Sequence, residues 1–148
     1  MPELFIGSDH RGYELKERLV KDLNSSSDYT VSDLGPFTYD PDDDYNDAAL
    51  AVAKAVASQP ESRGILVCGS GNGVVIQANR VKGVRAIAPT LPELARLGRE
   101  HNDANVLCLS ADFLEYNKVA ELANIFLNTK FSGEERHKRR NQRLDEEV

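Results

Sequence analysis

Short apolar runs alternate along this chain with longer segments in which apolar residues recur every three or four positions. Such runs are typical of buried strands, and the longer segments of amphipathic helices. Strand character is found at residues 4–6, 29–31, 65–67, 85–88 and 106–109. Helical spacing is found at 15–23, 49–56, 74–80, 92–99 and 114–127. This alternation predicts an α/β fold, with a parallel sheet and helices on both of its faces.

Length and charge narrow the class of protein. The 148 residues suffice for one domain, 1–148, and the formal net charge of −6 argues against a nucleic-acid partner. No apolar run has membrane length and the amino terminus does not resemble a signal peptide, so we expect no membrane contact and a cytoplasmic location. The two cysteines, Cys68 and Cys108, are expected to be free thiols, with Cys108 a plain core residue.

The segment 64–74, GILVCGSGNGV, carries the strongest chemical signal. An apolar strand ends in Cys68, and glycines then occupy every second position before a helix begins. Glycine permits tight turns and leaves backbone N–H groups accessible, so the loop predicts a cradle for a phosphate or an oxyanion. The spacing matches neither the dinucleotide-binding nor the Walker motif. A tight strand-to-helix turn without function remains the alternative.

Polar clusters flank two other strands. Segment 7–12, GSDHRG, follows the first strand, and segment 99–103, REHND, directly precedes the fifth. Ligands in parallel α/β sheets bind at the carboxyl ends of the strands. We therefore expect both clusters and the glycine loop to converge on one rim as an acid–base site. Individually they allow simpler interpretations, since Asp9 can cap a helix and a lone histidine is often only hydrogen-bonded.

Three segments together resemble a known family: GSDHRGYELK, ILVCGSGNGVVIQANRVKGVRA and REHNDANVL. They are similar to the signature blocks of type B ribose-5-phosphate isomerases and related sugar-phosphate isomerases, including galactose-6-phosphate isomerase subunits. The resemblance covers residues 4 to about 143. It implies a Rossmann-like three-layer sandwich with a central five-stranded parallel sheet and a helical tail, 129–148, that packs on a partner subunit. It also implies a homodimer or homotetramer with shared active sites, and aldose–ketose isomerisation of a small sugar phosphate without metal or cofactor.

The resemblance also implies catalytic roles. Cys68 corresponds to the base that moves the carbon-bound proton, because the glutamate used by another branch of the family is replaced here by Val74. His101 corresponds to the group that assists ring opening, together with Asp9, and an imidazole suits proton transfer near neutral pH. Ser70 corresponds to a hydroxyl that moves protons between the substrate oxygens.

The remaining site residues follow from the same resemblance. The loop amides would hold the enediolate oxygen, and the arginine pair, four residues apart, would bind the phosphate on one helix face. The expected substrate-binding residues are His10, Tyr45, Gly69, Gly71, Asn72, Gly73, Val74, Asn102, Arg136 and Arg140. A merely solvated tail helix is the alternative for the last two.

Two departures from the family pattern stand out. Asp112 occupies a position where many members have an arginine, which places an anion near the expected phosphate. Tyr45 is followed by Asn46 where the family usually has proline. The preceding acidic run, 40–44, lacks the glycine and closing glutamate of a calcium loop, and we expect it to be solvated.

These observations leave two classes of function. The first is an isomerase, with ribose 5-phosphate and ribulose 5-phosphate as the default pair and other sugar phosphates of four to six carbons as alternatives. The second is a catalytically silent sugar-phosphate-binding protein on the same fold. The presence of Asp9, Cys68, Ser70 and His101 favours the enzyme, whereas Asp112 favours the silent protein.

Overall fold

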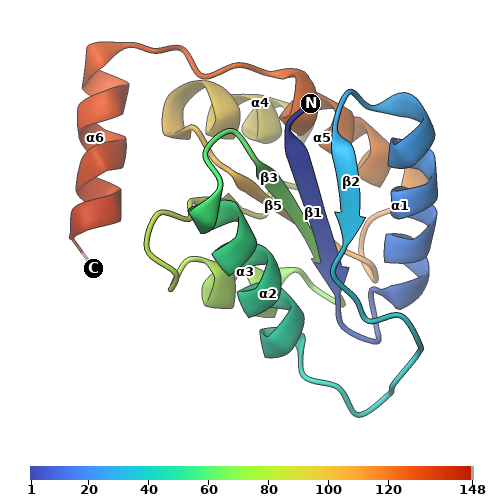
Figure 1. The fold of residues 1–148 in the computed structure, drawn as a ribbon. Helices are drawn as coiled ribbons and strands as arrows, with labels where there is room; N and C mark the ends of the chain where they lie inside the picture. The colour runs from blue at the N-terminus through green and yellow to red at the C-terminus, as the bar shows by residue number, and fades with distance from the viewer. Residues whose placement is uncertain (148) are drawn as a thin grey trace.

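A parallel sheet of five strands forms the centre of the molecule (Figure 1). A computed structural model describes residues 1–147. The strands are β1 (Glu3–Ser8), β2 (Thr30–Asp33), β3 (Arg63–Cys68), β4 (Ala86–Ile87) and β5 (Val106–Ser110). The helices are α1 (Tyr13–Ser26), α2 (Tyr45–Ser58), α3 (Asn72–Ala78), α4 (Pro92–Asn102), α5 (Tyr116–Asn128) and α6 (Glu135–Glu146). The predicted three-layer α/β/α sandwich is confirmed.

Each face of the sheet is covered by its own apolar layer. Leu19 of α1, Ala95 of α4 and Phe126 of α5 pack in one buried cluster with side chains of β1, β3 and β5. Val52 of α2 and Val74 of α3 belong to the cluster on the opposite face. The central strands are buried on both faces, which explains why they read as continuous apolar runs rather than as alternating patterns.

The strand order β2-β1-β3-β5-β4 creates a topological switch between β1 and β3. From β1 the chain moves outward to β2, then crosses back over β1 to reach β3. The loops that leave the carboxyl ends of β1 and β3 therefore diverge to opposite faces and leave a crevice between them. Cys68 ends β3 at this crevice, and Ser8 ends β1 beside it, opposite Val67 in the pairing register.

One strand is shorter than predicted, and the predicted helical tail is present. Strand β4 comprises only Ala86 and Ile87, which is shorter than the predicted 85–88. The side chain of Asn79 donates to the Ala86 carbonyl at 2.9 Å and accepts from its N–H at 2.8 Å. Asn79 thus takes the place of a further strand at this edge. Helix α6 lies at the side of the molecule (Figure 1). It packs against α4 through His137 and Asn141, and its other described residues are mostly exposed. Among residues 1–147, no helix combines the length and apolar character needed to cross a membrane.

Candidate active site

Cys68 lies at the last position of β3, at the start of the glycine loop. Its side chain is buried, and the N–H of Gly71 donates a hydrogen bond to its Sγ at 3.2 Å. Gly71 adopts a φ of +83°, a conformation that residues with a side chain rarely adopt. A backbone donor directed at the sulfur stabilises the negative charge of a thiolate, and the thiolate is the form of cysteine that can accept a proton. Cys68 therefore lies where the strand ends and where a backbone donor meets its sulfur.

The rest of the loop presents backbone donors. The N–H of Asn72 donates to Ser70 Oγ at 3.1 Å, whereas the N–H groups of Gly73 and Val74 have no hydrogen-bond partner among residues 1–147. The side chain of Val74 is wholly buried in the core, so only its backbone can serve a ligand. A Cβ at Gly73 would lie 2.7 Å from the ring of Tyr45, so only glycine fits beneath this ring. Free amides next to a thiol suit the binding of an oxyanion.

Asp9 and His10 lie at the crevice beside this loop. Asp9 is buried and its Oδ1 accepts a hydrogen bond from the N–H of Gly12 at 3.0 Å. Gly12 is itself the N-cap of α1, which has no side-chain cap bond, so Asp9 fixes the turn before the helix rather than capping it. Asp43 Oδ1 accepts from the backbone N–H of His10 at 3.0 Å and lies 2.8 Å from its Nδ1. The prediction that the run 40–44 is only solvated is therefore wrong at Asp43. Asp43 is a site residue that sequence reasoning missed.

Arg11 is a second residue missed from the sequence. Its guanidinium donates to the Asp112 carboxylate, and this ion pair lies directly over Gly69. A Cβ at Gly69 would lie 2.7 Å from Arg11 Cζ and 2.9 Å from Asp112 Oδ2. The negative charge of Asp112 is thus compensated by a neighbouring cation, so it does not stand alone beside the loop. The sequence did contain a signal for Arg11, because this residue belongs to the same polar segment as Asp9 and His10.

Cys108 differs sharply from Cys68 although the two strands are adjacent. It lies inside β5, packs in the cluster under α2 and α3, and is 1% exposed. Burial, with a smaller contribution from Cys68, raises the pKa of Cys108 far above its usual range. The prediction that Cys108 is a core residue is confirmed.

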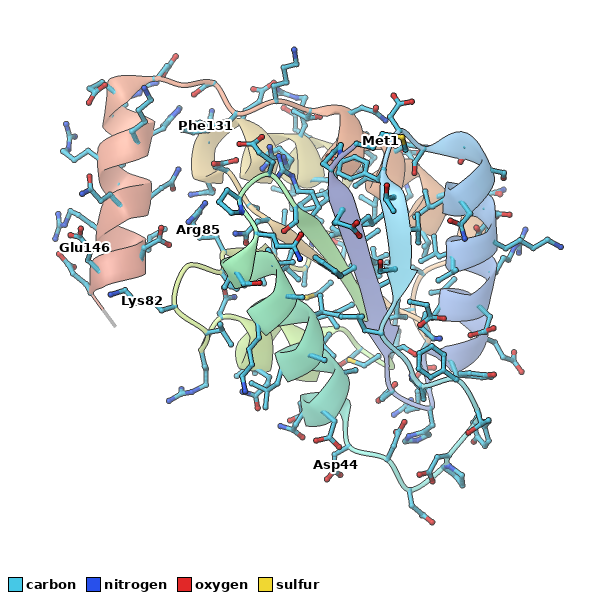
Figure 2. The ribbon with its side chains drawn as sticks, viewed as in Figure 1. Met1, Asp44, Lys82, Arg85, Phe131 and Glu146 are labelled. Carbon is cyan, nitrogen blue, oxygen red and sulfur yellow. The ribbon has the colours of Figure 1, made fainter. Side chains whose placement is uncertain are left out.

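His101 and Asn102 do not converge with these groups within one chain, which corrects the expected single rim. They end α4 and precede β5, and a residue that precedes a parallel strand lies at the amino edge of the sheet. Gly64 pairs with Val106 at that edge, whereas Cys68 pairs with Ser110 at the other. The length of β3, roughly 16 Å at ~3.3 Å per residue, therefore separates the two edges. In Figure 2, Asp44 marks the carboxyl edge and Phe131 the amino edge.

The expected phosphate-binding arginines lie near His101 instead. The rings of His101 and His137 stack with centroids 4.4 Å apart, and Asn141 Nδ2 donates to the His101 carbonyl at 2.9 Å. Burial and the neighbouring His101 lower the pKa of His137, which favours its neutral form in this contact. Arg136 and Arg140 are exposed on the same helix, so α6 brings both cations to the side of the molecule that carries His101.

The chain therefore holds two separate groups of candidate residues. We call Asp9, His10, Tyr45, Cys68 and the loop 69–74 the cysteine half-site. We call His101, Asn102, Arg136 and Arg140 the histidine half-site. Within residues 1–147, no cluster of three or more His, Cys, Asp or Glu side chains is arranged to hold a metal ion.

Comparison with known proteins agrees with this architecture. A family model described as Ribose/Galactose Isomerase matches residues 4–144. A protein named probable ribose-5-phosphate isomerase B, from Mycoplasma pneumoniae, is 42% identical over 136 residues, which cover 92% of this chain and 89% of the relative. Ribose-5-phosphate isomerase B of Mycolicibacterium paratuberculosis is 37% identical over 137 residues, covering 93% and 86%.

Two solved structures are similar over nearly their whole length. Ribose-5-phosphate isomerase B from Mycoplasma genitalium with bound ribulose-5-phosphate has a TM-score of 0.93 and 40% identity, covering 98% of this chain and 95% of that one. The type B ribose 5-phosphate isomerase of Trypanosoma brucei has a TM-score of 0.93 and 37% identity, covering 100% of both chains.

Proposed function

Because this chain belongs to the ribose/galactose isomerase family, we propose that it is an aldose–ketose isomerase that interconverts ribose 5-phosphate and ribulose 5-phosphate. One observation carries the proposal: a thiol and free backbone amides meet at the topological switch of the sheet, where Gly71 N–H contacts Cys68 Sγ at 3.2 Å. The relative with bound ribulose-5-phosphate supports the choice of substrate.

The active site is completed by a second copy of this chain. The cysteine half-site lacks an arginine pair and a ring-opening histidine, and the histidine half-site of the same chain lies at the opposite edge of the sheet. A two-fold symmetric dimer places the histidine half-site of each copy over the cysteine half-site of the other. In this arrangement the described part of the expected tail, residues 129–147, packs on the partner, and a tetramer contains two such pairs; residue 148 lies outside the described residues.

Ring opening uses one group from each copy. The cyclic sugar opens when the proton of the anomeric hydroxyl is removed and the ring oxygen gains a proton. His101 supplies an imidazole for this proton transfer, and Asp9 of the other copy hydrogen-bonds the anomeric hydroxyl. Asp9 retains one carboxylate oxygen for this contact, because its Oδ1 is occupied by Gly12 N–H.

Isomerisation then moves one proton between adjacent carbons. The Cys68 thiolate takes the proton from C2 of the open-chain aldose, and the electron pair moves onto the carbonyl oxygen at C1 to give a cis-enediolate. The amides of Gly73 and Val74 stabilise the oxyanion. The hydroxyl of Ser70 passes a proton between the two substrate oxygens, and Cys68 returns its proton to C1 to form the ketose.

The phosphate lies at the histidine half-site. Arg136 and Arg140 are four residues apart on α6, so both guanidinium groups point to one side of the helix. Their exposure leaves them free to reach a phosphate bound over the partner's loop, and charge-assisted contacts of this kind are strong.

Two free thiols support the expected cytoplasmic location of the enzyme.

A ketose-formation assay over a panel of aldose phosphates tests the proposal. We expect turnover of ribose 5-phosphate above that of four- and six-carbon aldose phosphates, and loss of turnover in Cys68→Ala. Binding of ribose 5-phosphate without turnover of any panel member would instead identify a silent sugar-phosphate-binding protein.

A further inference from the structure

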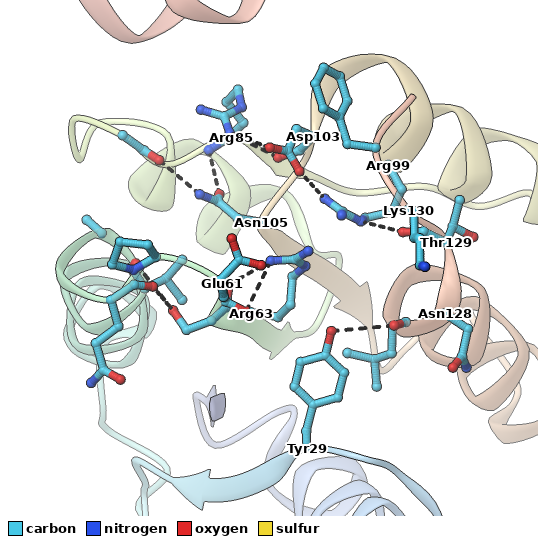
Figure 3. Close-up of a pocket in the computed structure, with 18 residues that line it drawn as sticks. Tyr29, Glu61, Arg63, Arg85, Arg99, Asp103, Asn105, Asn128, Thr129 and Lys130 are labelled. Atoms are coloured by element: carbon cyan, nitrogen blue, oxygen red, sulfur yellow. Dashed lines mark hydrogen bonds and ion pairs between the residues drawn. The ribbon is translucent and has the colours of Figure 1, made fainter. Parts of the chain in front are cut away.

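A pocket lies away from the cysteine half-site, at the amino edge of the sheet (Figure 3). Its volume is about 740 Å³, within the range of small-molecule sites. The walls come from the start of β3, the turn between α4 and β5, and the segment after α5. The expected sugar-phosphate chemistry uses none of these walls.

Cations dominate the charged lining. The pocket is lined by four basic side chains, Arg63, Arg85, Arg99 and Lys130, and by two acidic ones, Glu61 and Asp103. The chain as a whole carries a net charge of −6, so this excess of positive charge is a local feature. A positively charged pocket on an acidic protein favours an anionic ligand over a neutral one.

Arg99 is the most deeply buried of these cations. Its side chain is 2% exposed, and its Nη1 donates to Asp103 Oδ1 at 2.8 Å and to the Ala104 carbonyl at 2.7 Å, while its Nε donates to the Thr129 carbonyl at 3.0 Å. Burial and the nearby charge of Arg63 lower the pKa of Arg99. The guanidinium groups of Arg63 and Arg99 repel each other, and an anion bound between them would offset this repulsion.

Donors remain available for such an anion. Arg63 uses Nη1 to reach the carbonyls of Glu61 and Ser62, and neither its Nη2 nor that of Arg99 has a hydrogen-bond partner within residues 1–147. The Nε of Arg63 is buried with no partner in the same part of the chain. Lys130 is exposed at the rim, and no ion pair of its ammonium is found within residues 1–147.

We propose that this pocket is a second anion site that binds a phosphate-bearing small molecule, distinct from the sugar phosphate of the active site. The planar forks of Arg63 and Arg99 suit the oxygens of a phosphate, which guanidinium groups bind through paired hydrogen bonds. Lys130 adds a mobile point charge at the rim, and the volume exceeds what one phosphate group needs.

Amide NMR of the assembled protein, titrated with inorganic pyrophosphate, tests the proposal. We expect saturable shifts at Gly83, Asn128, Thr129, Lys130 and Phe131, which line the pocket. The loop 69–74 reports separately on the active site, so failure of the second site and failure of the proposed isomerase are distinguishable. Absence of saturable shifts at the pocket amides at millimolar pyrophosphate would overturn the proposal.

Two variants and a control sharpen this experiment. Arg63→Gln and Lys130→Gln should each raise the pyrophosphate concentration for half-saturation of the pocket signals about tenfold, and leave the loop signals unchanged. Lys130→Gln alters an exposed side chain, so it keeps the test valid if Arg63→Gln does not fold. Lys54→Gln, exposed on α2, is the control. If Lys54→Gln raises the pyrophosphate concentration for half-saturation as much as the other two variants do, the site is not specific. Tighter binding of malonate than of pyrophosphate would likewise refute a phosphate site.

Discussion

The two half-sites are built in opposite ways. In the cysteine half-site, Cys68 ends a strand buried on both faces, and the loop after it is held by backbone hydrogen bonds such as Ala111 N–H to the Cys68 carbonyl at 2.9 Å. In the histidine half-site, Arg136 and Arg140 project from a helix that contacts α4 mainly through His137 and Asn141. The cysteine half-site is set into the core, whereas α6 carries Arg136 and Arg140 as an exposed arm.

This difference corresponds to the two tasks. Moving a proton between adjacent carbons requires a base and oxyanion donors held to within a fraction of an ångström, and packing in the core provides that precision. Reaching across to a second copy requires side chains that extend from the surface. The ion pair of Arg85 with Asp145, at 2.7 Å, supports the arm without burying its arginines. The thiol and amides expected to move the carbon-bound proton are thus separated from the arginines expected to bind the phosphate.

The largest effect is expected in the cysteine half-site. Cys68→Ala removes the base and should lower turnover by ~10²–10⁴-fold while substrate binding persists, because the arginines and amides remain. Cys108→Ala is the matched control, since it removes a buried thiol that the reaction does not use. Steady-state kinetics with isothermal titration of ribose 5-phosphate separates the two quantities. Near-normal turnover of Cys68→Ala would reject the assignment of the base.

Mixing two inactive variants tests whether the halves meet across subunits. Cys68→Ala and His101→Asn should each be inactive alone, but a mixed dimer contains one site with both native residues. Random pairing should restore about a quarter of wild-type activity, since half of the dimers are mixed and each has one intact site.

The control for this mixture combines two changes in the same half. Cys68→Ala mixed with Ser70→Ala leaves every site defective, so no activity should return. If the first mixture also remains inactive although mixed dimers form, each chain carries a complete site and the comparison between the halves is wrong.

The arm is expected to act on affinity rather than on the proton transfer. Arg140→Ala should raise KM about tenfold with a smaller change in kcat, because one charge-assisted contact to the phosphate is lost. Lys138→Ala removes a cation two positions away, on another side of α6, and should change neither constant. An equal rise in KM for both variants would mean that α6 contributes only its general charge.

The fold and the position of Cys68 before a glycine-rich loop could be predicted from the sequence because both depend on local patterns. Apolar runs that alternate with helical spacing marked all five strands, and glycines after Cys68 marked the loop. The bond between His10 and Asp43 could not be found this way, because the two residues are 33 positions apart and the acidic run around Asp43 resembles a solvated loop.

The position of His101 shows a different limit of sequence reasoning. The motif was recognised, but its edge of the sheet depends on whether it follows a strand or precedes one. His101 precedes β5, and this places it with the amino ends even though its expected partners follow β1 and β3. The prediction of one rim within a single chain failed for this reason.

The smallest expected effect concerns the ion pair of Arg11 with Asp112, which lies over Gly69 at the edge of the cysteine half-site. Both side chains are partly exposed, 58% and 34%, and pairs of this kind contribute about 0.2–1 kcal/mol. Asp112→Asn leaves the charge of Arg11 uncompensated above the loop, which favours anions there. We expect KM for ribose 5-phosphate to fall by up to about fivefold, with the free energy of unfolding nearly unchanged.

Arg11→Gln in the Asp112→Asn background provides the matched control, because it removes the released cation and should return KM to or above the wild-type value. If Asp112→Asn instead raises KM, Asp112 serves the substrate by fixing the guanidinium of Arg11 in place, and Arg11 then acts only in that orientation. If neither variant alters KM, the pair lies outside the path of the substrate. The cysteine half-site would then end at Gly69, and the histidine half-site would supply every cation that the phosphate meets.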